Sequence, residues 1–136
     1  MEIQLINEEL LAELRGKAKE SERKRTNFDL RNTPEDTSQR MLNVMEVGTF
    51  IPVHRHLDSS ETFVCIKGKM DVVFYEETPD SVVGESLQGG QEVRRVRVCP
   101  ADGVYGVQIP KAAWHTVEVL EPTVIIGVMD GRYQGK

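Results

Sequence analysis

Three histidines and one glutamate are the residues of this chain whose types and spacing could do chemistry. His54 and His56 stand one residue apart in the segment GTFIPVHRH, and Glu61 follows a short connection. On a strand, alternate side chains share a face, so both imidazoles would point into one volume. An antiparallel partner strand beginning at Glu61 would bring its carboxylate beside them. The sequence therefore predicts three converging polar groups.

The third and last histidine reaches the same interior. His115 stands in PKAAWHTVEVL, where a turn containing proline leads into a strand. Residues 115, 117 and 119 share one face of that strand, and Val117 and Val119 are apolar, so this face points inward. All three histidines are thus expected to meet inside one folded unit.

Neutral imidazoles and a carboxylate together are the donor set of a divalent first-row metal. A lone interior histidine is more often a satisfied core residue than a ligand, but four such groups buried without a cation would be costly. We therefore predict one divalent transition metal ion, either Fe, Mn, Zn, Ni or Co, held by His54, His56, Glu61 and His115.

The elements that must position these residues are short strands. After a helix over residues 8–20, which Asn7 caps and Glu8 and Glu9 begin, residues 21–40 are charged and irregular. From residue 41 onward, eight short runs rich in Val, Ile, Phe and Tyr alternate with Gly, Pro and Asp, and each is expected to form a strand: MLNVMEV, FIPVHRH, ETFVCIKG, KMDVVFYEE, VRRVRVC, VYGVQIP, HTVEVL and TVIIGVMD. This pattern predicts an antiparallel sandwich or barrel over 41–136, with 1–40 packed on it as an arm in a single overall domain. IKGKMDVVFY is expected to form a hairpin, and residues 78–91 a mobile excursion.

The spacing Gly48-x5-His54-x-His56-x4-Glu61-x6-Gly68 reproduces the first motif of the cupin superfamily, which the chain resembles over roughly residues 41 to 130. The second motif matches less well. Six residues rather than five separate Gly103 from Pro110, Ala112 replaces a glycine, and Val119 replaces an asparagine; Pro110 and His115 keep their spacing. The resemblance implies an all-β double-stranded β-helix, a jelly-roll-like barrel with one N-terminal helix, and the same four metal ligands.

Within that RmlC-like superfamily, the chain looks most like the WbuC-family cupin fold metalloproteins, which are found among bacterial surface-polysaccharide gene sets. The likeness rests on Arg23, Arg25 and Asn27 ahead of the barrel, on the segments QRML, PVHRH, WHT and LEP, and on a final Gly-x-Tyr. One departure is Asp29, which stands in NFDL where the family would have a histidine.

Four further residues are candidates for roles around the metal. Arg23, Arg25 and Arg40 could hold an anionic group such as a sugar phosphate, because a guanidinium group forms bidentate hydrogen bonds with phosphate. A solvated charged arm is the alternative for these arginines. Tyr105 alternates with Val107 and Ile109, so it could line the interior as an acid or hydrogen-bond donor. Core packing is the alternative for Tyr105.

The expected function is that of a small metalloenzyme, an isomerase, epimerase or oxygenase acting on a sugar-derived or polyhydroxylated small molecule. The alternative is a non-catalytic, metal-dependent carbohydrate-binding or sensor module. A formal charge of −5, from 17 basic and 22 acidic residues, argues against nucleic acid as a partner. Without a leader or a long apolar run, we expect a cytoplasmic protein with no membrane partner, and a homodimer.

Overall fold

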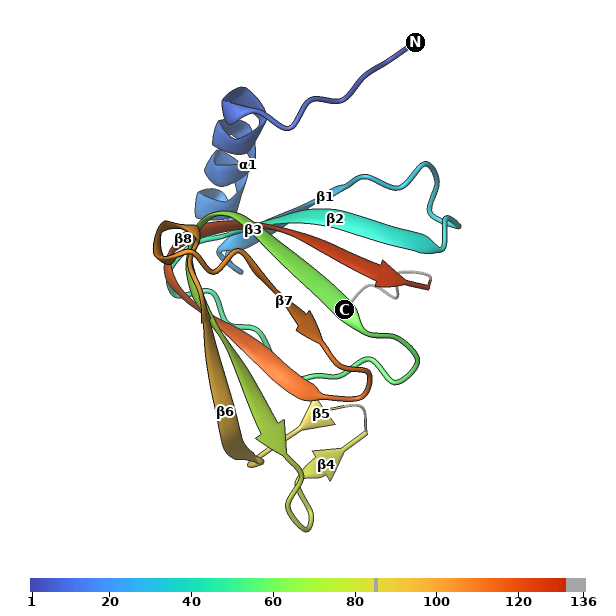
Figure 1. Cartoon of the computed structure of the whole chain (residues 1–136), viewed down its shortest axis with the longest axis vertical. Coiled ribbons are helices and arrows are strands. Elements are labelled where there is room, and N and C mark those ends of the chain that lie inside the picture. Colours follow the sequence, from blue (N-terminus) through green and yellow to red (C-terminus); the bar gives the residue numbers. More distant parts are fainter. Residues whose placement is uncertain (85, 132–136) are drawn as a thin grey trace.

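The structure, a computed structural model, describes residues 1–84 and 86–131 and is all-β with one N-terminal α-helix, as the sequence predicts (Figure 1). In chain order its elements are α1 (Glu8–Glu20), β1 (Arg25–Asp29), β2 (Ser38–Met45), β3 (Glu61–Glu76), β4 (Val82–Val83), β5 (Ser86–Leu87), β6 (Gln91–Val98), the 3-10 helix η1 (Pro100–Asp102), β7 (Gly106–Ile109) and β8 (Trp114–Asp130).

Two long strands, β3 and β8, form the frame of the molecule. They pair antiparallel from Glu61 opposite Met129 to Tyr75 opposite Trp114. At the Glu61 end, β8 also pairs with β2, β2 pairs with β1, and β3 pairs with β7. At the other end β3 pairs with β6. Each end of the β3–β8 pair thus belongs to a different layer of strands. The two layers diverge from a bend in the middle of β3 and β8 (Figure 1).

The bend in this frame lies at Gly68. Its φ is +111°, and an added Cβ would lie 2.5 Å from the carbonyl oxygen of Pro122 and 2.6 Å from the Cα of Thr123. The register of β3 against β8 shifts at this point. The fully buried Thr123 hydroxyl accepts a hydrogen bond from the amide of Lys69 at 3.1 Å, which ties the two strands together at the bend. Only glycine fits this close approach without strain.

Three strand predictions were wrong, for related reasons. The hairpin expected at IKGKMDVVFY does not form, because Gly68 bends one continuous strand instead of ending it. HTVEVL and TVIIGVMD likewise form the single strand β8. FIPVHRH is not a strand and makes only an isolated bridge at His54. Conversely, the predicted irregular arm contains β1, which the polar residues of RTNFD concealed.

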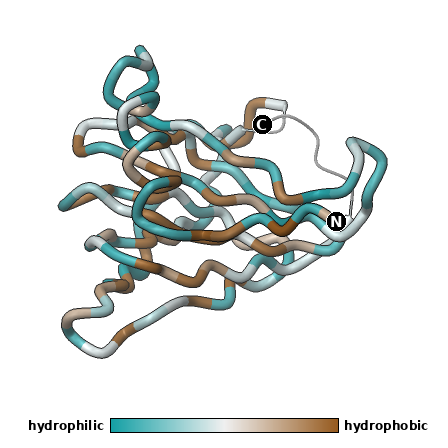
Figure 2. Tube along the Cα trace, turned by 90° about the horizontal axis from the view of Figure 1, so that it is seen from above, coloured by the Kyte–Doolittle hydropathy of each residue, from teal (hydrophilic) through white to brown (hydrophobic). Residues whose placement is uncertain are grey.

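The helix covers the outer face of one layer. The predicted span of residues 8–20 is confirmed, with the Asn7 side chain accepting from the amide of Leu10 at 3.0 Å. Buried side chains of α1 pack against outward residues of β2 and β8, namely Leu11, Leu14, Ala18, Leu42, Val44 and Val124. Figure 2 shows that hydrophobic and hydrophilic segments alternate along the chain. The inner face is therefore left for the second core and the site.

A second hydrophobic core lies between the two layers. It contains Met45, Phe63, Cys65, Met70, Val72, Val98, Ile109, Val117, Val119 and Ile125. The inward position of residues 117 and 119, which the sequence predicts, is thereby confirmed. Within residues 1–84 and 86–131, no helix has the length and apolar character needed to cross a membrane.

The bend gives a direct test of the frame. Gly68→Ala should lower the free energy of unfolding by about 3 kcal/mol or more, because the new Cβ clashes with backbone atoms and φ is left-handed. Gly16→Ala in α1 is the matched control: nothing lies within 4 Å of its added Cβ, so stability should rise by up to about 1 kcal/mol. Urea unfolding measures both; similar effects of the two variants would contradict this account of the bend.

Candidate metal centre

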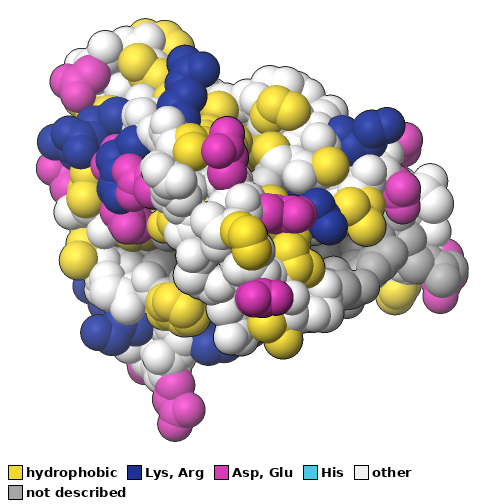
Figure 3. All heavy atoms as spheres, turned by 90° about the horizontal axis from the view of Figure 1, so that it is seen from below, with side chains coloured by type: hydrophobic (Ala, Val, Ile, Leu, Met, Phe, Trp, Pro, Cys, Tyr) yellow, Lys and Arg dark blue, Asp and Glu magenta, His cyan; other side chains and the backbone are white. Residues whose placement is uncertain are grey.

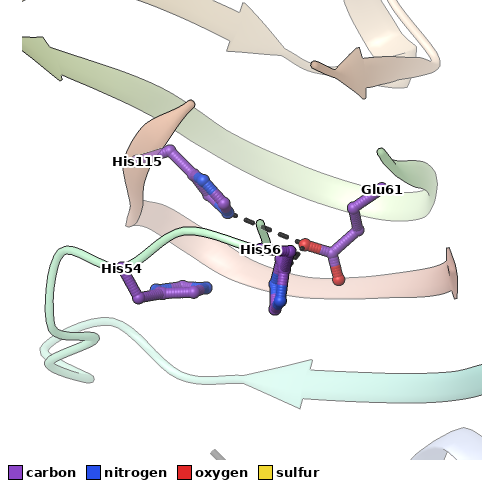
Figure 4. Close-up of side chains that lie close together, drawn as sticks. All are labelled: His54, His56, Glu61 and His115. Atoms are coloured by element: carbon purple, nitrogen blue, oxygen red, sulfur yellow. Dashed lines mark ion pairs between the residues drawn. The ribbon is translucent and has the colours of Figure 1, made fainter. Parts of the chain in front are cut away.

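The four predicted side chains come from one loop and from the first residues of two strands. His54 and His56 lie in the segment between β2 and β3, Glu61 is the first residue of β3, and His115 is the second residue of β8. Figure 4 shows their polar ends pointing toward one another. On the face of the molecule shown in Figure 3, no histidine is visible, and Lys and Arg side chains are interspersed with Asp and Glu.

Backbone hydrogen bonds hold the histidine loop without a regular strand. The amide of His54 donates to the carbonyl of His115 at 3.0 Å, and the amide of His115 donates back to His54 at 2.9 Å. The amide of Ala112 donates to the carbonyl of His56 at 2.8 Å. These three bonds fasten both histidines of the loop to the start of β8, so the isolated bridge does the positioning that we expected of a strand.

Ala112 shows why the second motif tolerates a departure. The residue has a φ of +67°, the left-handed conformation that glycine adopts freely. Alanine reaches it at a cost of roughly 1–2 kcal/mol. The turn that delivers His115 is therefore kept, although its glycine is absent.

The distances within the cluster fit a shared cation. The ring centroid of His54 lies 4.4 Å from that of His115 and 5.3 Å from that of His56. One potential ligand atom from each of the four residues lies within 4.8 Å of every other. Donors bound at about 2.0–2.2 Å to one ion lie about 3–4 Å apart, so small shifts suffice to bind it. The predicted convergence is confirmed, and the role of these residues as ligands stays a prediction.

The hydrogen bonds of two rings set their tautomers. Nδ1 of His54 lies 2.9 Å from the carbonyl oxygen of Pro52, and Nδ1 of His115 lies 2.9 Å from that of Ala113. A carbonyl oxygen only accepts, so each Nδ1 carries the proton and each Nε2 keeps its lone pair. This is the usual arrangement around metal-ligating histidines.

Three atoms at the centre of the cluster are buried without a hydrogen-bond partner: His56 Nε2, Glu61 Oε1 and His115 Nε2. Glu61 Oε1 lies 3.3 Å from His56 Nε2 and 3.6 Å from His115 Nε2. With unprotonated nitrogens, lone pairs face a carboxylate oxygen at these distances. A cation between them would remove this repulsion and satisfy all three atoms.

The pKa values suit metal binding at neutral pH. Burial, together with the nearby His115, lowers the pKa of His54 to about 4. Burial alone would raise the pKa of Glu61, but pairing with His115 and His56 in their protonated forms outweighs burial and lowers that pKa to about 2. At pH 7 the imidazole of His54 is therefore neutral and the carboxylate of Glu61 ionised, which are their ligating forms.

A clamp outside the cluster was not predicted from the sequence. The guanidinium of Arg55, between the two loop histidines, lies 4.2 Å from the centre of the Trp114 ring, next to His115. Both side chains also reach Glu77, at 3.1 Å from Arg55 Nη1 and 2.8 Å from Trp114 Nε1. The sequence could have indicated this contact. Arg55 and Trp114 each stand next to a predicted ligand, and neighbouring side chains in extended backbone point to opposite sides.

The predicted interior position of Tyr105 is wrong. Its side chain is 63% exposed, and β7 begins only at Gly106, so the expected alternation with Val107 does not extend to it.

The three predicted anion-binding arginines contact other parts of the chain. Arg25 donates to the carbonyl of Phe50 at 2.7 Å and so supports the segment that leads to His54. Arg40 forms an ion pair with Asp36 at 3.1 Å. Arg23 is exposed. Their role in binding a phosphate stays a prediction.

Comparisons with known proteins place this geometry in context. The family model described as "Domain of unknown function (DUF6016)" matches residues 6–86. No curated protein sequence matches the chain significantly. The predicted Gly-x-Tyr ending, which includes Tyr133, extends beyond the described residues.

Solved structures share the fold at low sequence identity. The capsular polysaccharide assembling protein CapF from Staphylococcus aureus is 22% identical with a TM-score of 0.57, over 85% of this chain and 30% of that one. KdgF from Halomonas sp. is 14% identical with a TM-score of 0.58, over 81% of each chain. A cupin-2 domain protein from Shewanella frigidimarina is 17% identical with a TM-score of 0.53, over 79% and 80%. The chain spans only 27–30% of the CapF chains. These likenesses show the cupin fold.

Removal of one ligand tests the cluster. The native protein should hold one equivalent of a divalent transition metal, and His56→Ala should lose most of it, because three donors remain where four are buried. Leu57→Ala is the matched control, since Leu57 is the neighbouring residue and is 58% exposed. Elemental analysis after dialysis measures the metal. Full stoichiometric retention by His56→Ala would contradict the ligand assignment.

Proposed function

The chain belongs to the family described as a domain of unknown function, DUF6016, and from its site we propose that it is a metal-binding cupin that acts on a small sugar-derived or polyhydroxylated molecule. The observation that carries this proposal is the set of three buried, unpartnered donor atoms on His56, Glu61 and His115. Together with His54 they would hold one divalent transition metal ion, and its identity depends on availability as well as geometry.

In a five- or six-coordinate ion, four protein donors leave one or two coordination positions for a ligand. A metal held there would supply Lewis-acid polarisation of a carbonyl or hydroxyl group or, if it is iron, activation of dioxygen. The protein contributes orientation. The backbone bonds between His54 and His115 and the clamp of Arg55 and Trp114 keep the donors in place on both sides.

The substrate class has two supports besides the donor set. The chain resembles the WbuC-family proteins of surface-polysaccharide gene sets, and its fold is similar to that of a capsular polysaccharide assembling protein. We therefore propose a role in bacterial surface-polysaccharide metabolism as an isomerase, epimerase or oxygenase. One observation favours a binding or sensor module instead: Tyr105, the predicted acid, is an exposed residue.

Isotope exchange separates these functions. Metal-loaded protein incubated with aldoses, ketoses and sugar acids in D2O should catalyse deuterium incorporation next to a carbonyl if it is an isomerase or epimerase, as measured by NMR. Oxygen consumption with the same compounds would instead identify an oxygenase. The His56→Ala variant is the control for both reactions. Binding without either reaction would support the non-catalytic module, and absence of binding by metal-loaded protein would contradict the proposed substrate class.

A further inference from the structure

The inner face of β2 carries polar side chains in line with the metal cluster. Met45 packs in the core between the layers, whereas Leu42 and Val44 pack against α1. Because side chains alternate along a strand, Gln39 and Asn43 share the inner face with Met45. The buried Met41 lies between the two amides on this face, and the two amides give it a polar character that suits a polar ligand.

The strand register places Gln39 in one row with Glu61. Gln39 is paired with Met129 of β8, and Met129 is paired with Glu61 of β3. Directly paired residues point to the same face and their Cα atoms lie about 4.5–5.5 Å apart, so the Cα atoms of Gln39 and Glu61 are about 10 Å apart. This Cα–Cα span is comparable to the length of a small sugar derivative, and Met129 is the residue between the two in the row.

The side chain of Gln39, like the metal cluster, has a buried polar atom without a hydrogen-bond partner. The side chain is only 7% exposed, and its Oε1 is buried without a hydrogen-bond partner. In the part of the chain that the structure describes, the other buried side-chain atoms without a partner are the three donor atoms of the metal cluster. A buried acceptor left unsatisfied is costly, so all four atoms point to partners from outside the chain.

The row is also close to solvent. Met129 lines a surface groove of about 480 Å³, together with Asp58, Ser60 and Lys111. Residues 58–60 follow His56, and Lys111 lies in the turn before His115, so the groove borders the loop with His54 and His56 and the turn that leads to His115. A small molecule could reach the row from this side.

We propose that Gln39 is a specificity-determining residue, whose Oε1 accepts a hydrogen bond from a hydroxyl group of a ligand that coordinates the metal through its other end. The inference rests on the proposed function and narrows its substrate class to chelating molecules with a distal hydroxyl group. A neutral amide oxygen selects a neutral hydrogen-bond donor, so this end of the ligand carries a hydroxyl group rather than a phosphate. Met129 would lie along the carbon chain between the two ends.

A matched pair of probes tests Gln39. D-gluconate and 2-hydroxyhexanoate both chelate through a 2-hydroxycarboxylate, but only gluconate carries further hydroxyl groups. Changes in the absorption spectrum of the cobalt(II)-loaded protein report binding, with ultrafiltration confirming that the cobalt stays on the protein. The native protein should prefer gluconate by about five-fold or more, the effect of one hydrogen bond that a buried acceptor would otherwise lack.

The variant Gln39→Leu should bind cobalt normally, bind both probes with similar affinity, and unfold at the same or a higher temperature as the metal-free protein. Gln91→Leu makes the same chemical change at an exposed position of β6 and should keep the preference. An unchanged preference in Gln39→Leu, a destabilised fold, or no preference in the native protein would overturn the inference and leave the metal site intact. Failure of the native protein to hold cobalt would instead contradict the proposed function.

Discussion

The structure depends on one electrostatic constraint: three imidazoles and a carboxylate meet in one volume, where the donor atoms of His56, Glu61 and His115 are buried without a hydrogen-bond partner. Glu61 Oε1 and the Nε2 atoms of His56 and His115 face one another at 3.3 and 3.6 Å. Without a cation, this arrangement would leave unsatisfied acceptors in a site that water reaches poorly, and each would destabilise the fold. With a cation, the same atoms become ligands, and part of the metal's binding energy stabilises the fold.

The rest of the fold can be understood as the means of bringing these donors together. The bend at Gly68 lets β3 and β8 serve both layers, so Glu61 and His115 arise from opposite ends of the same paired strands. The loop with His54 and His56 is fastened on the inside by backbone bonds and on the outside by the contact of Arg55 with Trp114. Ligand orientation therefore depends on residues that do not bind the metal.

The sequence was sufficient to predict the cluster and the fold class, because both follow from local patterns. Three histidines, one glutamate and their spacing identify the site, and alternating apolar residues identify the strands. It was insufficient where tertiary contacts decide. Gly68 could end a hairpin or bend a strand, and only its close approach to Pro122 distinguishes the two. Tyr105 continued an alternating pattern beyond the point where β7 begins, and the unsatisfied amide of Gln39 became visible only from its burial.

The central claim is that four particular side chains bind one metal ion together. X-ray absorption spectroscopy of the metal-loaded protein measures this most directly, because imidazole rings give a characteristic scattering pattern. The account predicts three imidazole nitrogens and a carboxylate oxygen at about 2.0–2.2 Å, with further oxygen from water or ligand. A first shell with fewer than three imidazoles, or with sulfur from Cys65 or Cys99, would contradict it.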